Sequence, residues 1–448
     1  QIGEGVELVN GIIGYGCRVF YGSKAVRFVL GNNCALKYGA RLIHSILGDN
    51  STVSCCEVLN NLVFPAHEQH HNNSFLIASM IMGQSNMAAG ATVGSNHNSR
   101  GNDGEIIAGR GFWTGLSSAL KHNSRFASFT MITKGHYPFE LNIPLPFCML
   151  ANNSENTLRE IMPAYWWMYN MYALLRNSWK TQIRDKRAFA EQHFETDYLA
   201  PDTAAEIIEA LVWLESREAE IDGNDKITVP GRVFERSNLP VIIVKARKSM
   251  AAYRDMLTYY AVKTLVYHFF ETGDFDFEKF SAVHGENISL EWENLGGQLA
   301  PHDKVEALRA AIRSGGISSW EAVHAEYKRL LSEYPHDKAL NALQVLRFLS
   351  GGTAITNREW AAFLDKAASI RLYIEEQVYF TKRKDYTDPF RNISYHTEAE
   401  RDAVLGKIED NPLLSHVREE SAEFFGMLAR SACKPVGGLK PVAGGFIL

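Results

Sequence analysis

The sequence predicts a parallel β-helix in roughly its first third and a mainly α-helical region after it. Apolar residues recur at spacings of 6, 6 and 5, so the pattern repeats every 17 residues. Small residues recur two positions before most of these apolar ones. From about residue 154 onward the pattern changes to the 3.6-residue period of amphipathic helices. A short fixed period followed by helical periodicity favours a coiled β-domain joined to a helical one.

The 17-residue repeat is visible in "IIGYGC", "VLGNNC" and "ILGDNS", which begin at Ile12, Val29 and Ile46. One apolar position per strand can be followed from Ile2 to Val93, and 16 of its 17 positions are apolar. Side chains two residues apart on a strand point the same way. We therefore expect three short strands per coil, with the small residue near a corner and the apolar residue in the interior.

Two further expectations follow from the repeat. Gly14, Gly31 and Gly48 occupy one corner of three consecutive coils, where we expect a positive φ that glycine adopts at little cost. Cys17 and Cys34 occupy equivalent places on neighbouring coils, and we expect them to be small interior side chains and not a disulfide.

These patterns divide the chain into two domains. Residues 1–150 are expected to form the β-helix, with a loop excursion near 94–104, and further native coils are expected to precede Ile2. Residues 151–448 are expected to be helical, with a short strand near 240–244. The expected helices cover 157–186, 203–221, 244–272, 303–313, 319–333, 338–349, 357–381, 397–408 and 412–431.

Composition narrows the class of protein. The net charge of −5 argues against a nucleic-acid binder. The apolar stretches are too short to cross a membrane, and the start of the chain lacks the pattern of a signal peptide. Six cysteines in 448 residues do not predict a disulfide framework. We therefore expect a cytoplasmic protein without membrane or nucleic-acid partners.

Three histidines and a glutamate lie in "VFPAHEQHHNN", at residues 63–73. Leu76 and Ile81 return in phase after this stretch, which suggests that it occupies a regular strand and corner. Alternation then places Glu68 and His70 inside the coil, and His67, Gln69 and His71 outside. Buried Glu and His are costly unless paired, so the stretch predicts either an internal hydrogen-bond network or a polar notch open to a groove.

The tetrapeptide "HNSR" occurs at residues 97–100 and again at 122–125. The separation of 25 residues equals one coil of 17 plus an insertion of 8. The two copies are therefore expected to lie near each other on adjacent coils.

The small-spacer-aliphatic repeat resembles the left-handed parallel β-helix of the hexapeptide-repeat transferase superfamily. The whole chain also resembles bacterial proteins that combine a β-helix with a helical C-terminal half. The resemblance implies left-handed coils, a homotrimer, and acyl or acetyl transfer to a sugar or sugar-nucleotide. It also implies a histidine general base and acetyl-CoA or another acyl thioester as co-substrate, with no tightly bound cofactor. A neutral imidazole is the group that such chemistry needs.

On this interpretation the candidate bases are the histidines of the two polar segments: His70, His71, His97 and His122. The candidate substrate-binding residues lie beside them: Glu68, Asn72, Asn98, Arg100, Asn123 and Arg125.

Two other hypotheses remain open at this stage. One is a non-catalytic scaffold or regulatory β-helix protein related to sugar-nucleotide pyrophosphorylases. The other is a metal site like that of the γ-class carbonic anhydrases, built from His67, His71, His97 and His122.

Overall fold

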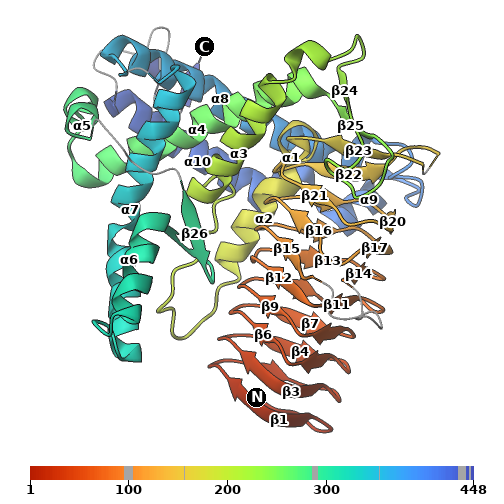
Figure 1. The fold of residues 1–448 in the computed structure, drawn as a ribbon. Coiled ribbons are helices and arrows are strands. Elements are labelled where there is room, and N and C mark those ends of the chain that lie inside the picture. The colour runs from red at the N-terminus through yellow and green to blue at the C-terminus, as the bar shows by residue number, and fades with distance from the viewer. Residues whose placement is uncertain are drawn as a thin grey trace.

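The structure is a computed structural model, and it describes residues 1–94, 104–155, 157–284, 291–352, 354–431, 440–442 and 445–447. Figure 1 shows a stack of short parallel strands that begins at the N-terminus. Helices gather at the far end of this stack and along one of its sides. The predicted fold class, a parallel β-helix with 17-residue coils followed by a mainly α-helical region, is confirmed.

Each coil contributes one strand to each of three faces. The first face contains the strands that follow one another as β5 (Arg41–Ile43), β8 (Glu57–Leu59), β11 (Phe75–Ile77), β14 (Thr92–Val93), β17 (Ser118–Leu120) and β20 (Gly135–Tyr137). The second contains β6 (Ile46–Leu47), β9 (Leu62–Val63), β12 (Ser79–Ile81), β15 (Ile106–Ala108), β18 (Arg125–Phe126) and β21 (Asn142–Ile143). The third contains β2 (Arg18–Val19), β4 (Ala35–Lys37), β7 (Thr52–Ser54), β10 (Glu68–Gln69), β13 (Asn86–Met87), β16 (Trp113–Thr114), β19 (Met131–Ile132) and β22 (Met149–Asn152). Two longer strands, β1 (Glu7–Ile13) and β3 (Lys24–Leu30), run round the corner between the first two faces.

The interior is a set of aliphatic rows that run along the stack. Val19, Leu36 and Val53 form one such row through the pairings of β2, β4 and β7, and all three are fully buried. Phe28 takes a position that is usually small, and Gly11 on the preceding coil makes room for it. A Cβ at Gly11 would lie 2.2 Å from the Phe28 ring.

The pairing of strands shows where the period departs from 17. Leu42 pairs with Val58, 16 positions later, and Val58 pairs with Leu76, 18 positions later. One residue is therefore missing from the corner before Val58, and one is added at the corner before Leu76. Val93 pairs with Leu120, 27 positions later, so this coil is longer than the repeat. The excursion expected near 94–104 lies almost wholly outside the described residues.

The glycines of the repeat have a different role from the expected one. Gly14, Gly31 and Gly48 do not have positive φ. The positive φ values lie two positions later, at Gly16, Asn33 and Asn50. The glycines are instead needed for close approach between coils, because a Cβ at Gly14 would lie 2.6 Å from the carbonyl carbon of Gly31.

The cysteines of the inner rows are thiols, as expected. Cys17 and Cys34 are buried and free. Each thiol donates to a backbone carbonyl of the next corner, from Cys17 to Gly31 at 2.9 Å and from Cys34 to Gly48 at 3.1 Å.

Three further strands cover the C-terminal end of the stack. β23 (Arg159–Met162) pairs antiparallel with β22, and β25 (Val241–Val244) and β24 (Lys226–Val229) continue the same sheet. The prediction of one long helix over 157–186 was wrong in its first part, because the edge of β22 offers unpaired backbone groups that β23 satisfies.

The helices surround a long central one, α4 (Ala246–Thr272), which packs against α3, α7, α8 and α10. The others are α1 (Tyr165–Tyr169), α2 (Met171–Ile183), α3 (Pro201–Glu215), α5 (Phe277–Val283), α6 (His302–Arg313), α7 (Trp320–Leu349), α8 (Asn357–Thr387), α9 (Glu398–Leu405) and α10 (Pro412–Ser431), with short 3-10 turns at Glu218–Glu220 and Ile408–Asp410. Two hairpins pair β26 (Trp292–Leu295) with β27 (Gln298–Pro301), and β28 (Lys440–Val442) with β29 (Gly445–Ile447). Within the described part of the chain, every helix is too short or too polar to cross a membrane.

Candidate functional site

The stretch 63–73 has the opposite orientation to the predicted one. His67 and Gln69 are fully buried, whereas Glu68 is partly exposed and His70 and His71 are exposed. The prediction was wrong because the one-residue deletion before Val58 shifts the phase by one. A shift by one residue moves every side chain of a strand to the other face.

The buried side chains of this stretch form a directed chain of hydrogen bonds. Ser85 Oγ lies 2.8 Å from His67 Nδ1, and His67 Nε2 lies 3.2 Å from Gln69 Oε1. Gln69 Nε2 donates to Ser74 Oγ at 3.1 Å, and Ser74 Oγ donates to Cys56 Sγ at 2.9 Å. Because an amide oxygen can only accept, His67 carries its hydrogen on Nε2. Burial lowers the pKa of His67 to about 4, so the ring is neutral at pH 7.

On the outer side, Glu68 joins the β-helix to α2. Its carboxylate pairs with Lys180 and, at 2.9 Å, with Arg184. Burial of the carboxyl opposes its ionisation, but Lys180 and Arg184 outweigh burial and hold the pKa of Glu68 below its usual value. The side chain proposed for substrate binding is therefore already engaged by two cations.

His70 and His71 are brought together, with ring centroids 4.3 Å apart. They lie on the enlarged corner before Leu76, where Asn72 accepts a hydrogen bond from the next backbone N–H. Partial burial lowers the pKa of His70, although Glu68 opposes the shift. Both imidazoles are exposed, so the corner lacks the enclosed environment in which a base is usually positioned.

His122 and Asn123 lie at a different corner, on the far side of the first face. His122 is buried at 8% exposure, and the backbone N–H of Asn123 donates to Gly104 O at 2.9 Å. Arg125 is exposed on β18. His97, Asn98 and Arg100 fall in 95–103, outside the described residues, so the expected approach of the two "HNSR" segments stays a prediction.

The metal hypothesis also stays a prediction, since His97 is outside the described residues. His67 lies inside the coil, whereas His71 lies outside it on another corner from His122. Within the described ranges, one group of potential ligands lies within 4.8 Å of one another: Glu293, His302 and Glu306. Arg309 already pairs with both of these carboxylates, at 2.6 Å each.

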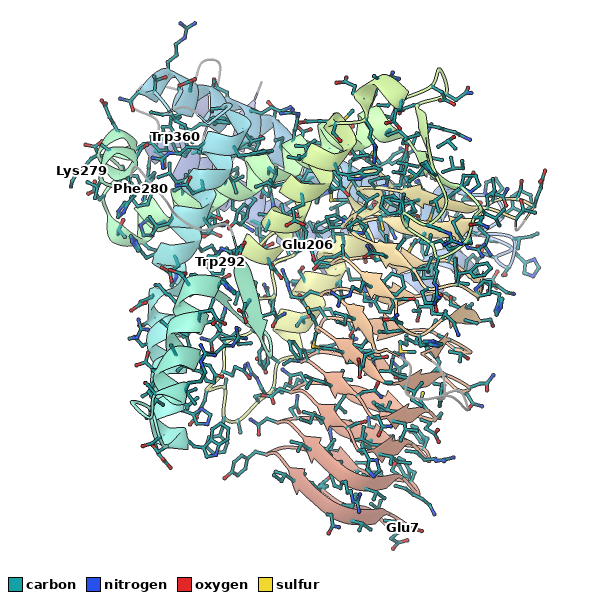
Figure 2. All side chains as sticks on the ribbon, viewed as in Figure 1. Glu7, Glu206, Lys279, Phe280, Trp292 and Trp360 are labelled. Carbon is teal, nitrogen blue, oxygen red and sulfur yellow. The ribbon has the colours of Figure 1, made fainter. Side chains whose placement is uncertain are left out.

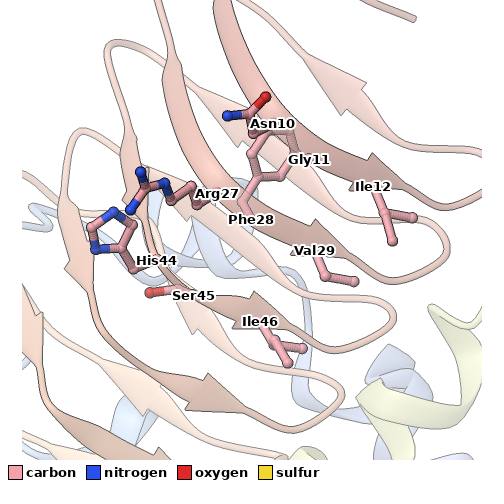
Figure 3. Close-up of a pocket in the computed structure, with 9 residues that line it drawn as sticks. All are labelled: Asn10, Gly11, Ile12, Arg27, Phe28, Val29, His44, Ser45 and Ile46. Carbon is pink, nitrogen blue, oxygen red and sulfur yellow. The ribbon is translucent and has the colours of Figure 1, made fainter.

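A shallow hollow lies on the outside of the first coils (Figure 3). Its volume is about 600 Å³, and it is lined by equivalent positions of three coils. Figure 3 shows Asn10, Arg27 and His44 along one edge and Ile12, Val29 and Ile46 along the other. On the polar edge, His44 Nδ1 lies 3.3 Å from Oδ1 of Asn60 on the next coil. The residues of this hollow follow the repeat and do not converge on a point.

A group of buried charged side chains, centred on Arg110, lies where the helices meet the β-helix. Arg110 is 2% exposed and makes two hydrogen bonds to Asp202, at 2.7 and 2.9 Å. It also donates to Gln84 Oε1 at 2.6 Å and to Asp197 O at 3.0 Å. Burial opposes the charge of Arg110, but Asp202 outweighs it and raises the pKa of the guanidinium above its usual value. A buried Arg–Asp pair of this kind fixes α3 on the coil.

Glu206 is a second contact between α3 and the coils, and Figure 2 shows it in this region. Its carboxyl accepts from the backbone N–H of Ser128 at 2.9 Å and from Ser128 Oγ at 3.1 Å. Burial and then the charge of Asp202 raise the pKa of Glu206 to about 8.

A cavity of about 380 Å³ opens beside Arg110, between the segment 193–197, α4 and α7. Glu195, 6% exposed, forms its inner wall. It accepts hydrogen bonds from Lys338 Nζ at 2.8 Å and from the Tyr334 hydroxyl. Burial opposes ionisation, but Lys338 and Arg110 outweigh it and hold the pKa of Glu195 at about 2. We call this space the junction cavity.

The other groups of the junction cavity carry different charges. Lys263 pairs with Asp197 at 2.7 Å, and this partner keeps the pKa of Lys263 above its usual value despite burial. Partial burial lowers the pKa of His193, although Glu195 opposes the shift. Partial burial also lowers the pKa of His268, and the neighbouring His336 and His284 add to this shift. The junction cavity thus brings imidazole, carboxylate and lysine side chains together.

Sequence reasoning missed this site because its residues are far apart in the chain. One signal was present: Arg110 stands between Gly109 and Gly111 in the coil region. A Cβ at Gly109 would lie 2.6 Å from Ser128 N, and one at Gly111 would lie 2.3 Å from the Phe129 ring. Two glycines beside a charged residue in an aliphatic repeat indicate a crowded, buried site.

Comparisons with known proteins place the chain among relatives without an established activity. Residues 1–216 match a family model described as "Domain of unknown function (DUF4954)". The chain is 51% identical over 454 residues to an uncharacterised protein of Treponema pallidum; the match covers 97% of this chain and 62% of that protein. The chain therefore spans less than two thirds of the length of this relative.

A solved structure of UDP-N-acetylglucosamine O-acyltransferase from Moraxella catarrhalis was also found. It shares 10% identity, with 47% of this chain and 91% of that chain covered, at a TM-score of 0.18. This likeness is too low to carry an argument, so the fold rests on the strand pairing itself. The chain is thus similar to a domain of unknown function in its first 216 residues and, over nearly all its length, to a longer Treponema protein.

Proposed function

We propose that this protein transfers an acyl group to a hydroxyl of a sugar or sugar-nucleotide, and that the reaction takes place in the junction cavity. The observation that carries the proposal is the gathering of imidazole, carboxylate and lysine groups in one cavity of about 380 Å³. His193 and His268 have lowered pKa values, while Glu195 is ionised beside the cation of Lys338. Perturbed titratable groups gathered in a cavity are a mark of functional sites.

The chemistry follows from these states. A neutral imidazole accepts the proton of the sugar hydroxyl while the oxygen attacks the carbonyl carbon of an acyl thioester. The new ester bond forms, the carbon–sulfur bond breaks, and the departing thiolate takes the proton back from the imidazolium. Lys263 and Lys338 lie where they can stabilise negative charge on the carbonyl oxygen. The donor in this proposal is acetyl-CoA or a related thioester.

The proposal moves the base away from the β-helix corner. His193 is exposed, as His70 and His71 are, but it lines the junction cavity, where its ring centroid lies 5.9 Å from that of Tyr334. Association into a homotrimer remains part of the proposal and is tested by light scattering.

A non-catalytic scaffold is the second candidate, and one observation favours it. The cavity charges are already paired with one another, Glu195 with Lys338 and Asp197 with Lys263. Such a network can hold helices on the β-helix without any ligand.

Ligand binding separates the two candidates. Isothermal titration of acetyl-CoA and of UDP-, GDP- and CDP-sugars is compared between the wild type, Lys338→Met and His193→Gln. Lys279→Met is the matched control, because Lys279 pairs with Asp274 on the surface of α5 (Figure 2). We expect saturable binding that Lys338→Met weakens at least tenfold, and acyl transfer that His193→Gln slows. Absence of binding by every one of these compounds would reject the transferase and favour the scaffold.

A further inference from the structure

A second cleft, of about 650 Å³, lies at another seam of the molecule. Its walls come from α1, the start of α2, the residue before α4, and the C-terminal end of α8 with the turn after it. Cavities of this size accommodate small organic ligands. It contains none of the residues that line the junction cavity.

One wall of the cleft is aromatic. Tyr165, Tyr169 and Tyr172 line it in succession on α1 and α2. The rings of Tyr165 and Tyr169 are 6.1 Å apart and tilted by 33°. Tyr172 receives a hydrogen bond from Asn411 at its hydroxyl, which fixes the ring from behind. Aromatic faces held in this way can stack on a planar ring.

The opposite wall is cationic. Lys245, Lys384 and Arg391 line it, and Asp385 is the one acidic side chain that does so. Asp385 pairs both with Arg391 of this wall and with Lys382, which does not line the cleft. The positive charge of the wall is therefore not balanced by Asp385. This excess of positive charge stands out in a chain whose net charge is −5.

Two of these cations are free to meet a ligand. Among the described residues, the Lys245 ammonium group has no hydrogen-bond or ion-pair partner. Lys384 lies over the Phe380 ring at 5.1 Å and also lacks an ion pair within the described part of the chain. A lysine without a partner on the wall of a cleft attracts anions.

Lys245 is one of several non-glycine residues with a left-handed backbone. Its φ of 61° and ψ of 39° are left-handed, a conformation that costs a non-glycine residue energy. A glycine would fit this position with less strain, so a Lys245→Gly substitution can remove the side chain without straining the backbone.

We infer that this cleft binds a nucleoside diphosphate or a closely related nucleotide. The phosphates contact Lys245, Lys384 and Arg391, and the base stacks against the tyrosines. Lys245 and Lys263 are 18 residues apart on or beside α4, which corresponds to roughly 27 Å along the helix. One nucleotide cannot reach both places, so this is a second site whose existence does not depend on the proposed transferase activity.

The experiment is isothermal titration of ADP, GDP, CDP and UDP into the full chain, with inorganic pyrophosphate and adenosine as separate arms. We expect at least one nucleoside diphosphate to bind saturably, and pyrophosphate and adenosine each to bind at least tenfold more weakly. Equal binding of pyrophosphate would show a phosphate site without base recognition and would overturn the inference. Absence of saturable binding by all four diphosphates would also overturn it.

Two substitutions at one position provide the structural control. Lys245→Met and Lys245→Gly both remove the ammonium group, but Lys245→Gly also relieves the left-handed backbone. We expect both to weaken binding at least tenfold, while Lys245→Gly unfolds at the same temperature as the wild type or higher. Unchanged affinity in Lys245→Gly would reject the site. Lys338→Met, which lies in the junction cavity, should leave this binding unchanged.

Discussion

Protonation of His67 is expected to weaken the β-helix at acidic pH. The ring is fully buried, and both of its nitrogens are engaged by Ser85 and Gln69. A proton on Nδ1 would break the hydrogen bond from Ser85 and place a charge inside the coil. The unfolded chain has no such penalty and takes up the proton near pH 6.5.

The magnitude follows from the two pKa values. The pKa of His67 is about 4 in the folded chain, against an ordinary value of 6.5. Between these values the unfolded state binds more protons than the folded state, so stability falls as the pH falls. The contribution is fully present above pH 6.5 and decreases by about 1.4 kcal/mol for each pH unit below it. We expect a loss of about 2 kcal/mol at pH 5 and about 3 kcal/mol at pH 4.

The assay compares the wild type with His67→Gln, which keeps an acceptor and a donor but cannot be protonated. Hydrogen exchange is followed by mass spectrometry in peptides covering β9 to β13, at pH 5 and pH 7.5. Local opening free energies of this segment isolate the coil from the helical region. All other titrating groups are the same in the two proteins, so the difference between their pH dependences reports His67.

The expected result is a wild-type opening free energy that drops by about 2 kcal/mol more than that of His67→Gln over this range. If the two proteins lose the same opening free energy between pH 7.5 and pH 5, the His67 ring is not the buried, neutral group described above. A ring that titrates near pH 6.5 by NMR would refute the reasoning independently.

Three further predictions concern the coil and its junction with the helices. Arg110→Met should lower the free energy of unfolding in urea by about 3–5 kcal/mol, because it leaves the carboxylate of Asp202 without its partner. Adding Asp202→Asn should recover part of this loss. A double variant that is no more stable than Arg110→Met would contradict the pairing. Gly31→Ala should lower the free energy of unfolding by about 1–3 kcal/mol in the same assay, because its Cβ would lie 2.6 Å from Asp49 N. Gly39→Ala should cost about 1 kcal/mol, because nothing lies within 4 Å of its Cβ but its φ is 72°. If Gly39→Ala cost more than Gly31→Ala, backbone conformation and not close approach between coils would set the cost of these substitutions. The folded pKa of Glu206, about 8, lies above its ordinary 4.5, so its carboxyl destabilises the fold increasingly as the pH rises between these values. Glu206→Gln should therefore be more stable than the wild type at pH 8 by about 4 kcal/mol, with the advantage absent at pH 4. Equal melting temperatures at pH 8 would count against the burial of this carboxyl.

The sequence by itself determined the repeat and most helices. Val19, Leu36 and Val53 could be assigned to one interior row because these first coils pair with each other 17 residues apart. α6 and α10 could be located because an amphipathic helix carries its period within its own residues. Both patterns are local, so a single sequence contains them.

Only the tertiary structure decided the orientation of residues 63–73. A residue lost before Val58 and one gained before Leu76 cancel over two coils, so the apolar spacing outside the segment looks undisturbed. Strand pairing alone shows the slip, and with it the burial of His67.

The junction cavity was equally beyond the sequence. Arg110 meets Asp202 across 92 residues, and Glu195 meets Lys338 across 143. No periodicity connects such positions, because their contacts arise only when α3 packs against the finished coil and α7 packs against α4. Burial then sets the pKa of each group by its neighbours in space, which the order of residues along the chain does not encode.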